Sequence, residues 1–401
     1  MPLIDEPDPP PPLLLRRARL WSRPEAPITP PQDLLLRDGR IQQISEVALD
    51  AGPDVAAPVG AAPRVLDLGG RIVTAGFWNC HVHLTEPVWR ARGAQALALQ
   101  QEALEDMLLS RGFVGAVDLS SIPWITSALI ERIVRGELRG PRILTAAGGI
   151  RPPRGIQYYI REDVPWYLRP LMPMPRTPAA ARRAVARQLR RGARVIKLFT
   201  GSYVTPDRVR VMRTEVARAA VEAAHEAGAV VFAHPSDRAG TAVAIEAGVD
   251  VLAHVPDLPS GTATMLARAA AQGRSLVPTL HLFASTGPQD PAYQEPIRAA
   301  LRGFRAAGGR VLFGTDVGFL PDRDTAPELA AMAACGMTPA DLLSSLTTEP
   351  AAVLGLPGTG TIGPGEPADL VVLERTEGPP TAEDLARIHR VIRGGRVLWS
   401  A

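Results

Sequence analysis

Six side chains of kinds that can bind metal ions lie where apolar runs of the chain end. They are His81, His83, Lys197, His234, His254 and Asp316. Residues i and i+2 of a β-strand point to the same side, so the imidazoles of His81-Val82-His83 can face one ion. Neutral imidazole and carboxylate ligands suit zinc and similar divalent ions. A single histidine at a strand end is more often structural, but this many candidates at one topological position predict a metal centre.

Lys197 is the only lysine among the 44 Lys and Arg residues of the chain. It lies in the apolar, β-branched run 194–199, which predicts a buried strand. An ammonium group buried there is costly unless it is paired or neutral. A lysine amine, unlike a guanidinium, can lose its proton and react with carbon dioxide to form a carbamate, an anionic ligand with two oxygens. The alternative is a lysine that reaches solvent or pairs with a carboxylate.

These ligands are enough for two ions, which we expect to be Zn²⁺. The expected division is His81, His83 and Asp316 around the first ion and His234 and His254 around the second. A carboxylated Lys197 and a hydroxide would bridge the ions, which lie about 3.5–4 Å apart in such sites. Metal binding lowers the pKa of water towards ~7, so hydroxide becomes available to attack a substrate carbonyl. Asp316 is the expected general base and would pass the proton to the leaving group.

Repeated strand–helix units between residues 71 and 356 would position these side chains. Eight apolar runs predict strands, and stretches rich in Ala, Leu and Arg between them predict helices. Alternating strands and helices imply a parallel sheet, and eight units imply a closed (β/α)₈ TIM barrel whose strand ends converge on one axis. The runs lie near 73–82, 114–119, 142–148, 194–199, 229–233, 250–253, 275–280 and 311–315, with helices expected at 94–111, 179–191, 207–227 and 291–307.

Both ends of the chain show a different pattern of short strands and turns. Residues 34–41 predict a hairpin that turns at Asp38-Gly39, and residues 391–398 predict a terminal hairpin. We therefore expect residues 13–70 and 357–401 to form a small composite β-sandwich domain beside the barrel. The acidic, proline-rich residues 1–12 predict a disordered tail.

The composition argues against several classes of protein. The chain has 401 residues, a net charge of +3 and only 5% aromatic residues, so nothing in it resembles a nucleic-acid footprint. No apolar run approaches the roughly 18 residues of a membrane span. Cys80 and Cys335 form no CxxC pair, and residues 1–12 lack the basic and apolar segments of a signal peptide, so we expect a reducing, cytoplasmic location. The expected partner is a small-molecule or short-peptide substrate, and a homo-oligomer stays open.

Further residues would shape the binding of the substrate. The long, proline-rich connection 150–178 leaves from the barrel face that holds active sites, so it would form a lid or a substrate wall, or else pack against the barrel for stability. His281, expected at the end of the seventh strand, would touch substrate or stabilise the oxyanion, or else bond to backbone. The aromatic candidates for substrate contact are Tyr158, Tyr159 and Trp166 in this connection and Tyr203 soon after Lys197.

Several of these motifs together resemble the amidohydrolase superfamily, and within it the imidazolonepropionase-like and prolidase-like metal-dependent hydrolases. The matching stretches are residues 75–84, 195–199, 233–234, 247–254, 312–316 and 365–373. The resemblance implies a (β/α)₈ barrel with a composite β domain, one or two divalent metals, and hydrolysis, usually of C–N bonds. We therefore expect hydrolysis of an amide, peptide or cyclic amide bond. The same hydroxide would also serve a lactonase, an esterase or a phosphoesterase, and a non-catalytic ligand-binding barrel is the alternative of another class.

Overall fold

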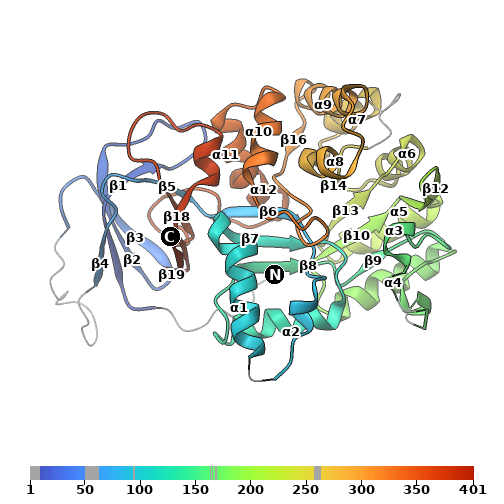
Figure 1. Ribbon diagram of the computed structural model, residues 1–401, viewed down its shortest axis with the longest axis horizontal. Helices are drawn as coiled ribbons and strands as arrows, with labels where there is room; N and C mark the ends of the chain where they lie inside the picture. The colour runs from blue at the N-terminus through green and yellow to red at the C-terminus, as the bar shows by residue number, and fades with distance from the viewer. Residues whose placement is uncertain are drawn as a thin grey trace.

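The computed structural model of the chain describes residues 10–49, 63–93, 95–162, 164, 166–167, 169–256 and 263–401. Most of the predicted disordered tail, residues 1–9, lies outside these ranges. Strands and helices alternate through the middle of the chain, and strands from both chain ends gather on one side of the molecule (Figure 1). The α/β class predicted from the sequence is therefore confirmed.

One sheet combines strands from both ends of the chain. It contains β1 (Leu13–Trp21), β2 (Pro31–Arg37), β3 (Arg40–Ser45), β4 (Arg64–Asp67), β5 (Ile72–Ala75), β17 (Leu370–Leu373), β18 (Ile388–Arg393) and β19 (Arg396–Ser400). The order is β19-β18-β17-β5-β1-β2-β3, and β4 pairs with β1. Both predicted hairpins are present, as β2–β3 and β18–β19. The contribution of both chain ends is thus observed, whereas the packing of this terminal sheet as a sandwich stays a prediction.

The first predicted strand, 73–82, is in fact two strands that belong to different sheets. β5 ends in the terminal sheet, and β6 (Phe77–Val82) begins a second sheet. Gly76 lies between them and donates its N–H to the carbonyl of Asp369. A Cβ on Gly76 would lie 2.3 Å from a methyl carbon of Val114, so the chain can cross between the sheets here only because this residue has no side chain.

Nine further strands pair in parallel and form two inner sheets. They are β6, β7 (Phe113–Asp118) and β8 (Arg142–Thr145) in one sheet, and β9 (Gly149–Ile150), β10 (Val195–Phe199), β13 (Val230–His234), β14 (Val251–Ala253), β15 (Ser275–Val277) and β16 (Arg310–Val311) in the other. Main-chain hydrogen bonds link the two sheets at both sides. The N–H of Arg194 donates to the carbonyl of Thr145 at 2.9 Å, and the N–H of Cys80 donates to the carbonyl of Phe313 at 2.8 Å. Closure into one eight-stranded barrel stays a prediction.

Helices lie around the inner sheets (Figure 1). They are α1 (Ala96–Met107), α2 (Pro123–Val134), α3 (Tyr158–Arg161), α4 (Pro178–Arg190), α5 (Thr214–Glu226), α6 (Arg238–Ala247), α7 (Ala263–Ala271), α8 (Leu280–Thr286), α9 (Pro291–Ala306), α10 (Ala326–Ala334), α11 (Pro339–Leu346) and α12 (Thr348–Val353). Short 3₁₀ turns occupy Pro87–Arg90, Leu109–Arg111, Arg169–Leu171 and Glu383–Ala386. In the described ranges, no helix has both the length and the apolar character that crossing a membrane requires.

One predicted helix, 207–227, is wrong at its beginning. Residues Arg208–Val211 form β12, which pairs antiparallel with β11 (Gly201–Thr205). The alternation of arginine and valine in β12 has the two-residue period of a strand rather than the period of a helix. The helix α5 begins only after this hairpin, and Tyr203 therefore lies on a strand.

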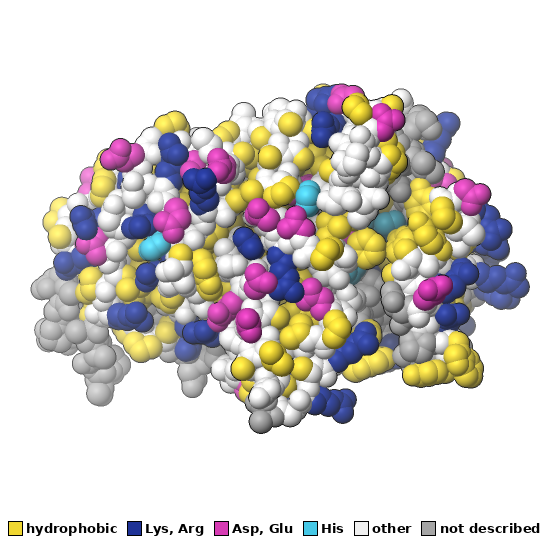
Figure 2. Space-filling view, in the orientation of Figure 1, with side chains coloured by type: hydrophobic (Ala, Val, Ile, Leu, Met, Phe, Trp, Pro, Cys, Tyr) yellow, Lys and Arg dark blue, Asp and Glu magenta, His cyan; other side chains and the backbone are white. Residues whose placement is uncertain are grey.

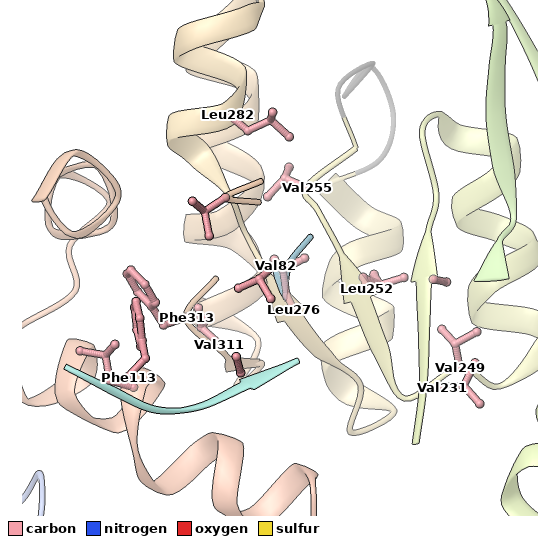
Figure 3. Close-up of a cluster of buried hydrophobic side chains, with 14 of the residues drawn as sticks. Val82, Phe113, Val231, Val249, Leu252, Val255, Leu276, Leu282, Val311 and Phe313 are labelled. Atoms are coloured by element: carbon pink, nitrogen blue, oxygen red, sulfur yellow. The ribbon is translucent and has the colours of Figure 1, made fainter. Parts of the chain in front are cut away.

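Apolar side chains between the inner strands and the helices form the main core (Figure 3). Val231, Leu252 and Leu276 come from consecutive strands of one inner sheet, and each is fully buried. Phe113 and Phe313 stack with ring centroids 6.0 Å apart, which joins β7 to the segment after β16. Each such side chain contributes about 1.5–3 kcal/mol on burial, so this core fixes the strands whose ends carry the polar residues.

Candidate metal centre

His81, His83 and Asp316 converge at the ends of their strands. Nε2 of His83 lies 2.9 Å from Oδ1 of Asp316, and Nε2 of His81 lies 3.3 Å from the same oxygen. The N–H of Asp316 donates to the carbonyl of His81, which holds the aspartate beside both imidazoles. Within the described ranges, these residues form one group of three possible ligands whose ligand atoms lie within 4.8 Å of one another. Three of the six predicted ligands therefore share one site.

His254 and His234 continue the same cluster. The ring centroid of His254 lies 4.5 Å from that of His81 and 4.5 Å from that of His234. The ring of Phe199, at the end of β10, lies 5.4 Å from that of His234. All four histidines predicted as ligands are therefore in one contiguous group.

The tautomer of His254 follows from the contacts of Thr279. The hydroxyl of Thr279 donates its single hydrogen to the carbonyl of Pro278 at 2.8 Å. Nδ1 of His254 lies 2.7 Å from the same hydroxyl oxygen, so this nitrogen must carry the proton and donate. The lone pair of the neutral imidazole is then on Nε2, free for a metal ion.

Lys197 is enclosed in the protein beside this cluster. Its side chain is 1% exposed, and its Nζ has no hydrogen-bond partner in the described part of the chain. Burial lowers the pKa of this amine to about 7, with Asp316 opposing the shift and Arg151 adding to it. A large fraction of the amine is therefore unprotonated at neutral pH, which is the form that reacts with carbon dioxide.

The buried histidines are neutral. Burial lowers the pKa of His81, His234 and His254 well below the usual value, and the charge of Lys197 and of neighbouring histidines lowers it further. Neutral imidazole is the form of histidine that binds a metal ion. The electrostatics of the site therefore favour metal binding over protonation.

The donor set fits divalent metal ions. Three of its buried atoms, Nδ1 of His81, Nζ of Lys197 and Oδ1 of Asp316, have no hydrogen bond within the described residues. Leaving a buried polar atom unsatisfied costs about 1–3 kcal/mol. The nitrogen and oxygen donors of this cluster suit zinc, and the six predicted ligands are the residues that could hold one or two such ions.

His281 is the predicted site residue whose placement was wrong. The strand β15 ends at Val277, and His281 lies in α8 instead of at a strand end. Both oxygens of Glu328 accept N–H bonds from the first turn of this helix, from Leu280 at 3.0 Å and from His281 at 2.6 Å. Nε2 of His281 lies 2.9 Å from Oδ2 of Asp322. A role in substrate binding or catalysis stays a prediction.

The predicted aromatic residues occupy two places. Tyr203 is nearly buried on β11, 9% exposed, whereas Tyr158 and Tyr159 on α3 are 42% and 37% exposed. The ring of Tyr159 lies 5.5 Å from that of Phe319, three residues after Asp316, so the long connection reaches the loop of the metal trio. Trp166 is 77% exposed and contacts Tyr167. Their contacts with substrate stay predictions.

Three polar residues that the sequence did not single out belong to this region. Thr279 orients His254, Glu328 caps α8, and Arg151 lies directly after β9 with 4% exposure. Arg151 follows the third apolar run, 142–148, by three residues, close to the topological position of the predicted ligands, and this was the available signal. It was missed because arginine is not a metal ligand. Thr279 and Glu328 had no such signal.

Figure 2 shows histidine atoms recessed in a hollow of this face, with apolar side chains gathered beside it. A separate cavity of about 500 Å³ lies between Ile133–Gly140 and the β18–β19 hairpin, and none of the predicted ligands lines it. The cavity is therefore separate from the predicted metal ligands.

Comparison with known sequences gives a consistent result. An uncharacterised protein of Mycobacterium tuberculosis is 32% identical over 230 residues, which cover 49% of this chain and 61% of that protein. The chain thus spans less than two thirds of the length of this relative. The imidazolonepropionase of Deinococcus radiodurans is 28% identical over 373 residues, covering 85% of this chain and 84% of that enzyme.

Comparison with solved structures extends the likeness over the whole chain. The crystal structure of a proposed prolidase from Bifidobacterium longum matches with a TM-score of 0.74 and 27% identity, covering 99% of this chain and 95% of that one. The sequence profile of the amidohydrolase family matches residues 72–398, which include all six predicted ligands. The chain therefore belongs to the amidohydrolase family, a family of enzymes, as its motifs predicted.

Proposed function

We propose that this chain is a metal-dependent hydrolase that cleaves an amide, peptide or cyclic amide bond. The observation that carries the proposal is Lys197, the only lysine, whose amine is buried without a hydrogen bond beside neutral histidines. The named relatives, an imidazolonepropionase and a proposed prolidase, support hydrolysis of a C–N bond.

The proposed architecture is a closed (β/α)₈ barrel with a composite β-sandwich domain at its side. We keep the domain bounds predicted from the sequence with one change. They are 71–356 for the barrel and 13–70 with 357–401 for the β domain. Because β5 pairs within the terminal sheet, we set the first boundary at Gly76.

Two zinc ions would be held by the predicted ligands, with Lys197 as a carbamate between them. The proposed division is His81, His83 and Asp316 on one side and His234 and His254 on the other. When bound, such ions supply a Lewis acid and a water of lowered pKa.

Asp316 is the proposed general base. Its buried carboxylate lies at the centre of the trio, where it would take a proton from the attacking water and deliver it to the leaving amine. Asp316→Asn keeps an oxygen ligand but cannot take the proton, so kcat should fall by about 10²–10⁴-fold. If lactones are turned over faster than every amide in a substrate panel, the proposed bond type is wrong although the metal site stands.

The carbamate can be tested directly because the chain has a single lysine. Protein purified with zinc and ¹³C-bicarbonate should give one carbamate ¹³C resonance in addition to any from the terminal amine. The control is Lys197→Arg, which keeps a long side chain that ends in nitrogen but cannot form a carbamate, and it should lack that resonance.

Metal content gives the second readout of the same proposal. Elemental analysis should find roughly two zinc ions per chain in the wild type and one or fewer in Lys197→Ala. About one ion in both proteins, together with no carbamate resonance, would return Lys197 to a structural role and leave a mononuclear site.

A further inference from the structure

The segments that carry His83 and Asp316 run side by side beyond these two predicted ligands. The N–H of His83 donates to the carbonyl of Val317 at 2.8 Å, and Oγ1 of Thr85 donates to the carbonyl of Gly318 at 2.9 Å. The two segments come from distant parts of the chain, one after β6 and the other after β16. The spacing of the metal trio therefore depends on the contacts that hold these segments together.

Main-chain hydrogen bonds order the segment after Asp316 up to Leu320. The N–H groups of Phe319 and Leu320 both donate to the carbonyl of Asp316, and the side chain of Leu320 is buried. Residues 321–324, all of them described, form neither helix nor strand, and among them only Arg323 is partly buried. Its side chain is therefore the least exposed anchor of this part of the segment.

Arg323 joins the two segments through Glu86, which lies three residues after His83. Nη2 of Arg323 donates to Oε1 and to Oε2 of Glu86, at 3.0 Å each. The two side chains are 23% and 22% exposed, so most of the solvent is kept away from the pair. Nη1 of the same guanidinium donates to Oδ2 of Asp106 on α1, a helix that carries no predicted ligand. Of these two anionic partners, only Glu86 belongs to a segment that holds a predicted ligand.

Two carboxylates beside Arg323 have partners of their own. Oδ2 of Asp322 lies 2.9 Å from Nε2 of His281, and Oδ1 of Asp324 lies 4.0 Å from Nη1 of Arg111. Both carboxylates are about half exposed, at 45% and 51%, and exposed ion pairs contribute little. Arg323 differs from both neighbours, because its pair is better shielded and its partner lies close to a predicted metal ligand.

We propose that Arg323 is a positioning residue of the metal centre. Its pair with Glu86 clamps the segment after His83 to the segment after Asp316 and thereby sets the spacing of these two ligands. The inference rests on the proposed metal centre and adds a residue to it. The sign of the effect separates positioning from charge. A cation near a divalent metal ion opposes binding by charge alone, so loss of Arg323 weakens metal binding only if the residue positions the ligands.

The test measures the affinity of the metal-free chain for Zn²⁺ alone, by competition with a chelator. Arg323→Gln and Glu86→Gln should each lower the affinity by about tenfold. The double variant should bind no more weakly than either single variant, because both substitutions remove the same contact. Charge alone predicts a different result, in which the double variant returns to the wild-type affinity because one charge of each sign is lost.

Two control variants isolate the contact with Glu86. Asp106→Asn removes the other partner of the same guanidinium, and it should keep the zinc affinity within about threefold of the wild type. Arg90→Gln removes an exposed cation four residues after Glu86, and it should not lower the affinity. All variants should keep the Tm of the metal-free chain within about 2 °C, because an ion pair at the surface contributes little to the overall stability.

Replacement of zinc by Co²⁺ gives a second readout, because the d–d absorption of Co²⁺ reports the geometry of its ligands. The spectra of Arg323→Gln and Glu86→Gln should shift in the same way, while Asp106→Asn keeps the wild-type spectrum. If Arg323→Gln does not fold, the spectrum of Glu86→Gln decides, since a loss of charge alone leaves the ligand geometry unchanged.

An unchanged or higher zinc affinity in Arg323→Gln would overturn the inference, while the proposed metal centre stands. The same holds for a double variant that returns to the wild-type affinity, because charge alone explains that result. A wild-type chain that binds no zinc would overturn the proposed metal centre and this inference with it.

Discussion

Replacing Glu328 should remove part of the dependence of the unfolding free energy on pH. Glu328 is 1% exposed, and burial raises the pKa of its carboxyl group to about 7 despite the two N–H bonds it accepts from α8. In the unfolded chain the same group has a pKa near 4.5. The folded state therefore binds the proton more tightly, and the stability contributed by the protonated group is full below about pH 4.5 and is lost as the pH rises to 7.

The magnitude follows from the size of the shift. A difference of about 2.5 pKa units corresponds to about 3 kcal/mol of unfolding free energy lost between pH 4.5 and 7.5. Glu328→Gln cannot titrate, but its amide has only one acceptor oxygen, so one of the two N–H groups of α8 loses its partner at every pH, at a cost of about 1–3 kcal/mol. The variant should therefore be about 1–3 kcal/mol less stable than the wild type at pH 4.5, and its stability relative to the wild type should rise by about 3 kcal/mol between pH 4.5 and 7.5.

Thermal unfolding of the metal-free protein between pH 4.5 and 8 measures this difference. Unfolding entropy of about 2.1 cal/mol/K per residue makes 3 kcal/mol equal to about 4 °C in Tm for a chain of this length. The control is Glu102→Gln, which removes an exposed carboxylate on α1. The reasoning is refuted if the difference in Tm between the wild type and Glu328→Gln changes by less than about 1 °C over this pH range. The buried carboxyl group would then make no pH-dependent contribution to stability.

Two further substitutions test the second layer of the metal site. In Gly318→Ala, the new Cβ would lie 1.7 Å from the carbonyl oxygen of His83 at a φ of +92°, so His83 must move and zinc affinity should fall on the order of 10–100-fold by competition with a chelator. Gly136→Ala has a similar φ of +71° but open space, so it should keep wild-type affinity. Thr279→Val removes the hydroxyl that accepts from Nδ1 of His254, so zinc affinity should fall by a similar factor, whereas Thr279→Ser should keep the wild-type affinity. Unchanged affinity in Thr279→Val would contradict the assigned tautomer.

The ligand cluster could be predicted because its residues come at the ends of the apolar runs that predict the strands. His81, His234, His254 and Asp316 each come where an apolar run stops, and parallel strands bring such positions to one edge. The structure brings these residues together, with His83 two positions after His81. Local spacing was sufficient here because strand direction alone decides which ends meet.

Other features could not be read from local spacing because distant residues decide them. The apolar run 275–280 looks like a strand to its end, but Glu328, 48 residues from Leu280, supplies the carboxylate that starts a helix there. The break at Gly76 likewise depends on two distant residues. Val114 leaves no room for a side chain there, and the carbonyl of Asp369 accepts the N–H of Gly76. In both cases the competing partner is far away in sequence.

Arg151 and Thr279 show a different limit. Neither residue type is a zinc ligand, so a search for ligands passes over both. Their importance lies in contacts that only the folded chain creates, with Ser120 and Gln157 for the arginine and with His254 for the threonine. Polar residues at strand ends therefore merit attention whatever their side-chain chemistry.

Backbone strain gathers where the inner strands end. Among the described residues, seven non-glycine residues with positive φ follow inner strands: Ser120, Ala147, Arg154, Ser236, His254, Thr279 and Asp316. Such conformations cost on the order of 1–3 kcal/mol each and persist only where the surroundings enforce them. At Asp316, with a φ of 61°, the N–H donates to His81 and the carbonyl accepts from Phe319 and Leu320.

These main-chain bonds hold the aspartate in its strained position by themselves. The fold thus brings Nε2 of His81 within 3.3 Å of Oδ1 of Asp316. Metal binding then requires no rearrangement of the strand ends. Its free energy therefore stabilises the folded chain by mass action, because none of it is needed to order the site.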